Sequence, residues 1–546
     1  MKNFFLLVNI FLSVQLFSEG NKYWIKFKDK NNNSFSLSNP QQFLSQQSIE
    51  RRTKQNISLN ETDLPITQSY VDSVSPFINN LIHRLKWFNL MVVQIDDSTK
   101  IDSIKQFSFV DSIAEIQFVP SRSLQSESKF ESVYEVDQSI VYPNKYGAAY
   151  RQANMLNVDL LHQMGYKGEG ITLSVMDNGF YNTDNIRAYD SVRNRIIGTW
   201  DFVNNEANVY NDGSHGENVL SCIAGNLPDK FIGTAPDANF YLLTTEDNSA
   251  EWVMEEYNWA AAAEYADSAG VQIFSTSLGY TTFNNDVGNH TYADLTGDKT
   301  VITHAANMAF GKGILVLNSA GNEGANSWHY VSAPADGDSV LAIGAVDSAE
   351  AVANFSGRGP TSAGRIKPDI CSQGVRSAVI QTDGSVGYSG GTSFSCPVMA
   401  GAAACLWGAV PDKTAREIYD AIIISADRFW TPDNNHGYGI PNFYNAYLLL
   451  KTNYSDKILK ISDDVTVYPN PFSDELNISL YNEEPKAHKI EIFDMQGRRV
   501  YSKEIFIRDK TFNLFTAAEL KTLSAGEYVL RYDGSKNFSH RIIKAK

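Results

Sequence analysis

The chain has few cysteines, and their positions restrict what they can do. Only four occur among 546 residues, Cys222, Cys371, Cys396 and Cys405, all in the middle of the chain. Cys396 and Cys405 stand nine residues apart on one predicted helix and point to opposite sides, so they cannot form a disulfide with each other. We expect four buried free thiols, with one disulfide between distant cysteines as the alternative.

Positive charge is also scarce. Lys and Arg together number 46 against 62 Asp and Glu, which gives a formal net charge of -16. Because this leaves no basic excess to neutralise phosphates, the composition argues against a nucleic-acid-binding protein. The 43% hydrophobic and 20% charged residues are typical of a globular protein, and a length of 546 residues predicts two to four domains rather than one core.

Long hydrophobic runs are missing after the N-terminal stretch. Met1-Lys2-Asn3 and the apolar residues 4–17 have the short basic start and short apolar core of a signal peptide, which we place at residues 1–19. No later segment reaches the length of a membrane span. We therefore expect the mature protein to be exported and soluble. Separately, we expect it to act as a monomer.

The rest of the chain shows three patterns. Residues 23–120 mix short strand and helix patterns and predict a small α+β unit, followed by a polar connection at 121–140. From residue 168 apolar strands alternate with helices, which is typical of a parallel sheet covered on both faces. After Tyr454 short alternating strands without helix signals predict a β-sandwich of about ninety residues.

Apolar runs in the central region predict strands at residues 171–176, 240–244, 273–277, 314–318 and 340–346. Helical patterns lie at about 215–224, 250–269, 301–311, 393–408 and 413–426. Active groups in such sheets gather at the carboxyl ends of the strands.

A glycine-rich turn at residues 388–401, YSGGTSFSCPVMAG, leads into an apolar helix. Gly390 and Gly391 allow a sharp turn that presents the Ser393 hydroxyl at the start of this helix. Unpaired N–H groups and the positive end of the helix dipole there favour the negative charge that develops when an oxygen attacks a carbonyl. The alternative is a Gly/Ser loop that only caps a core helix.

Three further polar residues stand where a strand ends or a helix begins. Asp177 follows one apolar strand, Asn322 follows another, and His215 opens a helix. Taken one at a time, Asp177 could simply belong to a turn, Asn322 could be an ordinary loop asparagine, and His215 could be incidental. Together with Ser393 they fall at strand ends and helix starts of one predicted sheet, which favours a shared site.

These residue types suit nucleophilic catalysis. A serine hydroxyl is a poor nucleophile until a neutral imidazole takes its proton, and a carboxylate on the other imidazole nitrogen fixes the tautomer and stabilises the imidazolium. A side-chain amide and the N–H of the serine can then hold the oxyanion.

Across about 300 residues the chain resembles the subtilisin-like serine proteases, whose catalytic residues also follow the order Asp, His, Ser. The matching segments are SVMDNGF (174–180), SHGENVLSCIAG (214–225), STSLG (275–279), NSAGNEG (318–324), NFSGRGP (354–360), KPDI (367–370) and SGGTSFSCPVMAG (389–401). The resemblance implies a secreted serine endopeptidase with a doubly wound, mainly parallel α/β sheet. It makes Asp177 the orienting carboxylate, His215 the general base and acid, Ser393 the nucleophile and Asn322 an oxyanion donor.

The same resemblance implies where a polypeptide substrate binds. Ser277-Leu278-Gly279 and Ala320-Gly321 would flank the main specificity pocket and pair with an extended peptide. Tyr280 stands where a second glycine is common, and we expect it to narrow the cleft. No cofactor is required. Family members often bind calcium, and the polar loop from Asn284 to Asp298 is the candidate for a structural calcium ion, although the ligand spacing of an EF-hand is missing and the metal residues stay unknown.

Some positions depart from the family pattern. Asn178 replaces the usual Thr or Ser, and Glu217-Asn218 replaces the commonest Thr-His. We expect Ser214 and Glu217 to form an S-x-x-E capping box around His215. In that position the Glu217 carboxylate could favour the imidazolium form of His215.

Two alternatives belong to other functional classes. One is a catalytically inactive surface adhesin on a protease fold, against which the complete set of catalytic residues argues. The other is a lipase or esterase, which would need a G-x-S-x-G elbow and the order Ser, Asp, His; the chain has neither around Ser393.

The flanking regions carry resemblances of their own. Residues 20–122 resemble, by position and strand–helix order, the ferredoxin-like inhibitory propeptide of these proteases, with an accessory domain as the alternative. The catalytic domain would then span 123–455. Residues 456–546 resemble the sorting domain of the bacterial type IX secretion pathway, through VYPNPF (467–472), IFDMQGR (492–498) and LSAGEY (523–528). That implies outer-membrane secretion machinery as a partner. A carbohydrate-binding sandwich is the alternative, but Trp is absent after residue 454.

Overall fold

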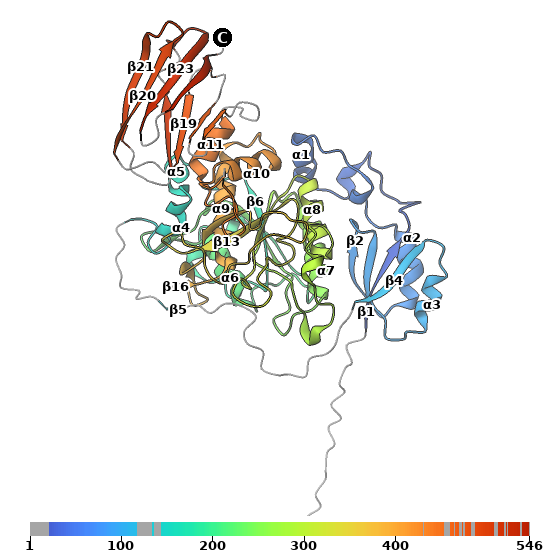
Figure 1. Cartoon of the computed structure of the whole chain (residues 1–546). Helices are drawn as coiled ribbons and strands as arrows, with labels where there is room; N and C mark the ends of the chain where they lie inside the picture. The colour runs from blue at the N-terminus through green and yellow to red at the C-terminus, as the bar shows by residue number, and fades with distance from the viewer. Residues whose placement is uncertain are drawn as a thin grey trace, which may run out of the picture.

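The computed structural model describes residues 21–116, 134–135, 144–429 and 431–451, then 459–462, 465–468, 472, 476–481, 486–506, 512–517, 520, 522–534 and 538–544. The predicted signal peptide and the predicted domain boundaries at 122/123 and 455/456 lie outside these residues. Figure 1 shows an N-terminal unit, a central domain and a C-terminal β-rich unit.

The N-terminal unit is an antiparallel sheet in the order β2-β3-β1-β4. Its strands are β1 (Lys22–Phe27), β2 (Asn80–Leu85), β3 (Leu90–Gln94) and β4 (Val110–Ile116), and its helices are α1 (Gln46–Lys54), α2 (Gln68–Val74) and α3 (Lys100–Lys105). Ile25 and Phe27 pack on the side of α2 and α3. The opposite face of the sheet, with Trp24 and Val92, shares a hydrophobic cluster with the central domain.

The central domain is built on seven parallel strands in the order β14-β13-β12-β11-β6-β10-β7, which confirms the expected α/β class. The strands are β6 (Thr172–Asp177), β7 (Ile196–Asp201), β10 (Asn239–Thr244), β11 (Ile273–Thr276), β12 (Leu315–Ser319), β13 (Val340–Val346) and β14 (Ile370–Gln373). Each of the five predicted strands is present. The sequence pattern missed β7, which is partly exposed, and β14, which has only four residues.

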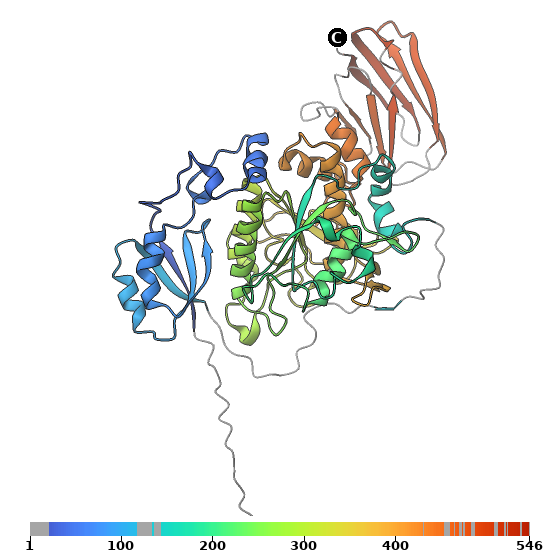
Figure 2. The same ribbon diagram turned by 180° about the vertical axis from the view of Figure 1, so that it is seen from behind.

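Helices cover both faces of this sheet. On one side lie α6 (Ser214–Ala224) and α9 (Thr392–Ala409), and on the other α7 (Met254–Ala269) and α8 (Val301–Gly311). Along β6, Leu173 and Val175 pack toward α6 and α9, while Met176 packs toward α7 and α8. Figures 1 and 2 show α7 between the central sheet and the N-terminal unit.

Smaller elements complete the central domain. They are α4 (Tyr150–Met155), α5 (Val158–Gln163), α10 (Ala415–Ile424), α11 (Phe443–Lys451), β8 (Asn226–Leu227), β9 (Phe231–Ile232), β15 (Ser377–Ile380) and β16 (Val386–Ser389). Within the connection predicted at 121–140, the structure describes only β5 (Tyr134–Glu135), which pairs with β16.

Buried charges join the N-terminal unit to the central domain. Arg51 and Arg52 on α1 both pair with Asp267 near the end of α7, with 2.8 Å between Arg52 Nη2 and Asp267 Oδ2. Asp63 accepts from both Arg52 and Lys312 at 2.8 Å. Burial acts to raise the pKa of Asp267, but the charges of Arg51 and Arg52 outweigh it and lower this pKa to about 2.

Glu264, one turn before Asp267 on α7, binds the hairpin between β2 and β3. Its two carboxylate oxygens accept from the backbone N–H groups of Lys86 and Trp87 at 2.7 and 2.8 Å. Burial raises the pKa of Glu264 to about 7, although the neighbouring Lys86 charge acts against that rise.

The C-terminal unit consists of two antiparallel sheets in the orders β17-β18-β19-β22 and β21-β20-β23-β24. Their strands are β17 (Leu459–Ser462), β18 (Val465–Tyr468), β19 (Leu476–Tyr481), β20 (Ala487–Asp494), β21 (Arg499–Phe506), β22 (Phe512–Ala517), β23 (Gly526–Asp533) and β24 (Phe538–Lys544). Ile478 from one sheet and Ile490, Ile492 and Leu530 from the other share one hydrophobic core. This is the packing expected of a sandwich.

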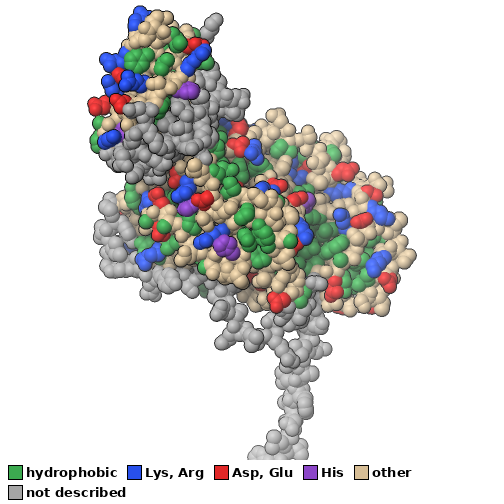
Figure 3. All heavy atoms as spheres, viewed as in Figure 1, with side chains coloured by type: hydrophobic (Ala, Val, Ile, Leu, Met, Phe, Trp, Pro, Cys, Tyr) green, Lys and Arg blue, Asp and Glu red, His purple; other side chains and the backbone are tan. Residues whose placement is uncertain are grey.

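All four cysteines are free thiols buried in the central domain, as predicted. Burial raises the pKa of each thiol, so all four stay protonated and unreactive at neutral pH. Among the described residues no helix is long and apolar enough to cross a membrane. On the face shown in Figure 3, acidic and basic side chains are interspersed.

Candidate active site

Asp177 and His215 meet at the end of the central strand β6. The Nδ1 atom of His215 lies 2.7 Å from Oδ1 of Asp177, and both side chains are buried. Oδ1 also accepts from the backbone N–H of Asn178 at 2.8 Å. Because a carboxylate only accepts, it holds the imidazole proton on Nδ1 and leaves Nε2 as the basic nitrogen.

Helix α6 does not begin as the sequence predicted. Gly213 takes the N-cap position with φ 77°, and it makes no side-chain cap. The capping box expected from Ser214 and Glu217 was therefore wrong. Instead Asn178, from the end of β6, accepts from the N–H of Gly216 at 3.0 Å and so ties the start of α6 to the sheet.

Gly216 lets α6 approach β6 closely. A Cβ atom at this position would stand 2.2 Å from the carbonyl oxygen of Gly179 and 2.9 Å from Cβ of Asp177. A larger residue would push α6, and His215 with it, away from Asp177. Gly216 was not among the predicted site residues, although the His-Gly pair in the matching segment was a usable signal.

Glu217 points away from His215. Its Oε1 atom accepts from the Tyr189 hydroxyl at 2.7 Å, and Oε2 accepts from Nδ2 of Asn218 at 2.8 Å. Burial raises the pKa of Glu217 well above its usual range, which favours the neutral form of this carboxyl group. A neutral Glu217 would not favour the imidazolium of His215, contrary to the expectation from the sequence.

Ser393 lies in the first turn of α9, one residue later than predicted because the helix begins at Thr392. Its carbonyl oxygen accepts from the Ser277 hydroxyl at 2.7 Å, which fixes α9 to the end of β11. The neighbouring Phe394 packs edge-on against the His215 ring, with 5.7 Å between the centroids. The structure thus brings His215 and Ser393 together near the carboxyl ends of the central strands, where Asp177 also lies.

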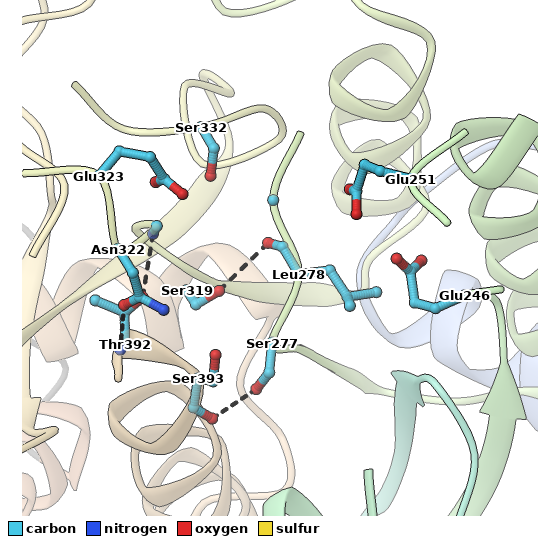
Figure 4. Close-up of a pocket in the computed structure, with 12 residues that line it drawn as sticks. Glu246, Glu251, Ser277, Leu278, Ser319, Asn322, Glu323, Ser332, Thr392 and Ser393 are labelled. Carbon is cyan, nitrogen blue, oxygen red and sulfur yellow. Dashed lines mark hydrogen bonds between the residues drawn. The ribbon is translucent and has the colours of Figure 1, made fainter. Parts of the chain in front are cut away.

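Asn322 is oriented by a residue that the sequence analysis missed. Its Oδ1 atom accepts from the backbone N–H of Thr392 at 2.9 Å and lies 3.0 Å from the Thr392 hydroxyl oxygen. With Oδ1 held in this way, the amide nitrogen faces the pocket above Ser393 (Figure 4). Thr392 stands directly before the nucleophile candidate, so its position in the matching segment was the available signal.

The predicted substrate-binding residues divide into two groups. Ser277, Leu278, Gly279 and Gly321 line a pocket that also contains Asn322 and Ser393 (Figure 4). Ala320 does not line it, and its methyl group is buried in a small cluster with Val331, Ala335 and Ala342.

Tyr280 does not narrow the cleft with its ring. The side chain is fully buried, and its hydroxyl donates to Glu246 beneath the pocket. Burial raises the pKa of Tyr280 well above its usual range, so the hydroxyl keeps its proton.

Two carboxylates of the loop from Asn284 to Asp298 pair with side chains of the protein, and a calcium ion in this loop stays a prediction. Asp294 pairs with Lys299 and accepts from Thr291 at 2.7 Å, while Asp298 accepts from His304 at 3.0 Å. These carboxylates turn to different partners and do not converge on one point, as calcium ligands would. Carboxylates do converge elsewhere among the described residues, at Glu246, Glu251 and Glu255.

Comparisons with known proteins match all three units. The Subtilase family (Peptidase S8) model matches residues 168–441. The model of the peptidase S8 propeptide domain of Bacteroidota matches 22–132, and that of the secretion system C-terminal sorting domain matches 466–545.

Three curated relatives share the central region. Serine protease AprX of Bacillus subtilis is 28% identical over 309 residues, which cover 51% of this chain and 66% of that protein. Subtilisin E of the same species is 29% identical over 322 residues, covering 58% and 76%. The subtilisin of Bacillus pumilus is 31% identical over 273 residues, covering 49% and 88%.

Proposed function

The chain belongs to the subtilase family of serine proteases, and we propose that it cleaves peptide bonds through Ser393, His215 and Asp177 with Asn322 as an oxyanion donor. It carries a propeptide domain, and its secretion sorting domain marks it for export to the cell surface or the medium. The observation that carries the proposal is the 2.7 Å contact between His215 Nδ1 and Asp177 Oδ1.

In the proposed first step, Nε2 of His215 takes the proton of the Ser393 hydroxyl while the oxygen attacks the substrate carbonyl. Asp177 stabilises the imidazolium that forms, because its carboxylate already accepts from Nδ1. His215 then donates the proton to the leaving amine, and an acyl-enzyme remains on Ser393. Water, activated by the same imidazole, hydrolyses this ester and restores the free hydroxyl.

The oxyanion of the tetrahedral intermediate would be held by Nδ2 of Asn322 and the N–H of Ser393. Thr392 supports this role, since its two contacts fix the amide of Asn322 before substrate arrives. A donor fixed in advance stabilises the developing charge without reorganising during the reaction. The position of Ser393 in the first turn of α9 adds the positive end of the helix dipole.

Substrates in this proposal are polypeptides bound in extended form along Ser277, Leu278 and Gly279 on one side and Gly321 on the other. The chemistry uses side chains of the chain itself and requires no cofactor. The protein would act as a monomer and meet the outer-membrane secretion machinery through its C-terminal domain.

We also propose that the propeptide domain holds the protease inactive until the chain is cut between Ser121 and Tyr142. The buried contacts of α1 and of the β2–β3 hairpin with α7 support tight association of the two units. Terminal sequencing should find a new N-terminus in that window for the wild type, and an intact chain for Ser393→Ala expressed alone. A wild-type enzyme fully active with its propeptide attached would contradict inhibition.

Ser393→Ala tests the nucleophile, with Ser395→Ala as the matched control. Ser395 lies in the same turn of α9, but its hydroxyl only donates to the Thr392 carbonyl at 2.9 Å. We expect Ser393→Ala to abolish peptide hydrolysis with an unchanged circular dichroism spectrum and melting temperature, and Ser395→Ala to keep most activity. Equal turnover by Ser393→Ala and wild type would exclude Ser393 as the nucleophile. A wild type without activity would favour the inactive adhesin.

A further inference from the structure

Two glycines, Gly279 and Gly321, form part of one side of the pocket beside Ser393. A Cβ atom on Gly279 would stand 2.0 Å from the Ser332 hydroxyl oxygen, and one on Gly321 would stand 2.8 Å from it. The same atom on Gly321 would lie 2.6 Å from Oε2 of Glu323. The two glycines therefore keep open a space that has the Ser332 hydroxyl and the Glu323 carboxylate at its boundary.

The Ser332 hydroxyl can form a hydrogen bond with a ligand. Ser332 is 1% exposed and lines the pocket, yet its Oγ atom has no hydrogen-bond partner among the described residues. Figure 4 shows this oxygen directed toward the pocket from above Ser319. Since a buried hydroxyl without a partner destabilises the fold, a polar ligand atom that reaches it would gain a hydrogen bond.

The other side of the pocket is acidic as well. Glu246 and Glu251 line the side of the pocket opposite Ser332 and Glu323, and Leu278 lies between the two sides (Figure 4). Carboxylate oxygens of Glu246, Glu251 and Glu255 lie within 4.8 Å of one another, although Glu246 is only 2% exposed. Carboxylates this close in a buried place create a potential that favours a cation.

Neutral donors hold two of these carboxylates in position. The Tyr280 hydroxyl donates to Glu246. The backbone N–H groups of Asp247 and Trp252 donate to Glu255 at 2.7 and 2.8 Å. Tyr280, which replaces the glycine common in the family, thus affects the pocket indirectly, by holding the Glu246 carboxylate in position.

We propose that this pocket selects basic peptide side chains, and this inference rests on the proposed peptidase function. Glu323 and Ser332 take the Lys or Arg whose carbonyl is attacked, because they adjoin Asn322 and Ser393. The nearby carboxylates of Glu246 and Glu251 add to the negative potential of this pocket. The ammonium or guanidinium group donates to the Ser332 oxygen and pairs with the Glu323 carboxylate.

Other side chains fit these boundaries less well. An apolar side chain would bury the Ser332 hydroxyl without giving it a hydrogen-bond partner, and an acidic side chain would be repelled by the Glu323 carboxylate. Hydrogen bonds to charged groups predict a preference of about 10- to 100-fold for arginine over citrulline, which has the same shape without the charge.

The test compares kcat/KM of the mature enzyme for three peptides that differ only in the residue before the scissile bond, namely arginine, citrulline or glutamate. For wild type we expect arginine to exceed citrulline about 10- to 100-fold, with glutamate the poorest. Glu323→Gln should lower the arginine-to-citrulline ratio about tenfold or more, and Ser332→Ala should lower it less. The exposed Glu169→Gln removes the same charge far from the pocket and should leave the ratio unchanged.

The citrulline peptide separates this inference from the proposed function. If wild type cleaves it and Ser393→Ala does not, the peptidase function stands whatever the ratios are. A wild-type ratio near one, or a ratio that survives both Glu323→Gln and Ser332→Ala, would overturn the basic preference.

Discussion

Replacing Asp267 with alanine should release the propeptide domain. Asp267 is fully buried on α7 and pairs with both Arg51 and Arg52 of α1. Burial is the main reason that the pKa of Arg51 falls to about 10, although Asp267 acts against this shift, so the charge of Arg51 depends strongly on its carboxylate partner. In Asp267→Ala, Arg51 keeps its bonds to backbone carbonyl groups such as that of Val271 but loses its carboxylate.

Removing one partner of a buried ion pair costs about 3 to 5 kcal/mol, or roughly 10² to 10⁴ in an equilibrium constant. Because both arginines regain water when the propeptide leaves, we expect this cost to appear as weaker association of the cut propeptide with the protease. The assay dilutes the processed complex and follows the return of peptidase activity. Release should be about a hundredfold faster or more in Asp267→Ala.

Asp237→Ala is the matched control, since Asp237 pairs with Arg195 at 2.7 Å in a partly exposed position. Pairs of that kind contribute about 0 to 1 kcal/mol, so release should change by less than about fivefold. If Asp267→Ala released its propeptide within twofold of wild type, the buried ion pairs would not hold the two units together.

Four further outcomes are expected. Release of the propeptide should accelerate roughly tenfold or more from pH 5 to pH 7, because the pKa of Glu264 is about 7 in the complex and near 4.3 once the group is exposed. Protonated Glu264 therefore stabilises the complex fully at low pH, and this stabilisation is lost as the pH rises. Glu264→Gln should flatten this pH dependence, and faster release in acid would contradict it. Glu217→Gln should move the pH profile of kcat/KM by less than about half a unit, since burial favours the neutral form of Glu217; a larger shift would mean that its charge acts on His215. Asn322→Ala should lower kcat about 10² to 10³-fold, the cost known for removing such a donor from a subtilisin, whereas a loss confined to KM would make it a substrate-binding residue. Deleting residues 462–546 should leave a folded protease that stays in the periplasm, which cell fractionation would show; activity of this form at the cell surface would refute the sorting role.

The parallel sheet could be predicted from the sequence because its strands are buried on both faces. A strand such as β13 is apolar along its whole length, so its pattern does not depend on its neighbours. The strands β7 and β14 lie at the two edges of the sheet, where an exposed face or a short run weakens the pattern. The connection around Tyr134 gave no strand signal, since its pairing with β16 depends on a partner more than 250 residues away.

Side-chain direction was the part of the site that the sequence could not specify. Ser214 and Glu217 have the spacing of a capping box, but Asn178 from another element satisfies the start of α6 instead. Burial in the core raises the pKa of Glu217 and so favours its neutral form, and Ala320 faces away from the pocket although its neighbour Gly321 lines it. Each of these outcomes is decided by tertiary contacts.

The most direct measurement is labelling of the mature enzyme with a fluorophosphonate, followed by mass spectrometry of its peptides. We predict one adduct on Ser393, lost in Ser393→Ala and strongly reduced in Asp177→Asn, where His215 is no longer held in the basic tautomer. Ser395→Ala should label like wild type. Absence of any adduct in a mature, folded enzyme, or an adduct on a residue other than Ser393, would exclude Ser393 as the nucleophile.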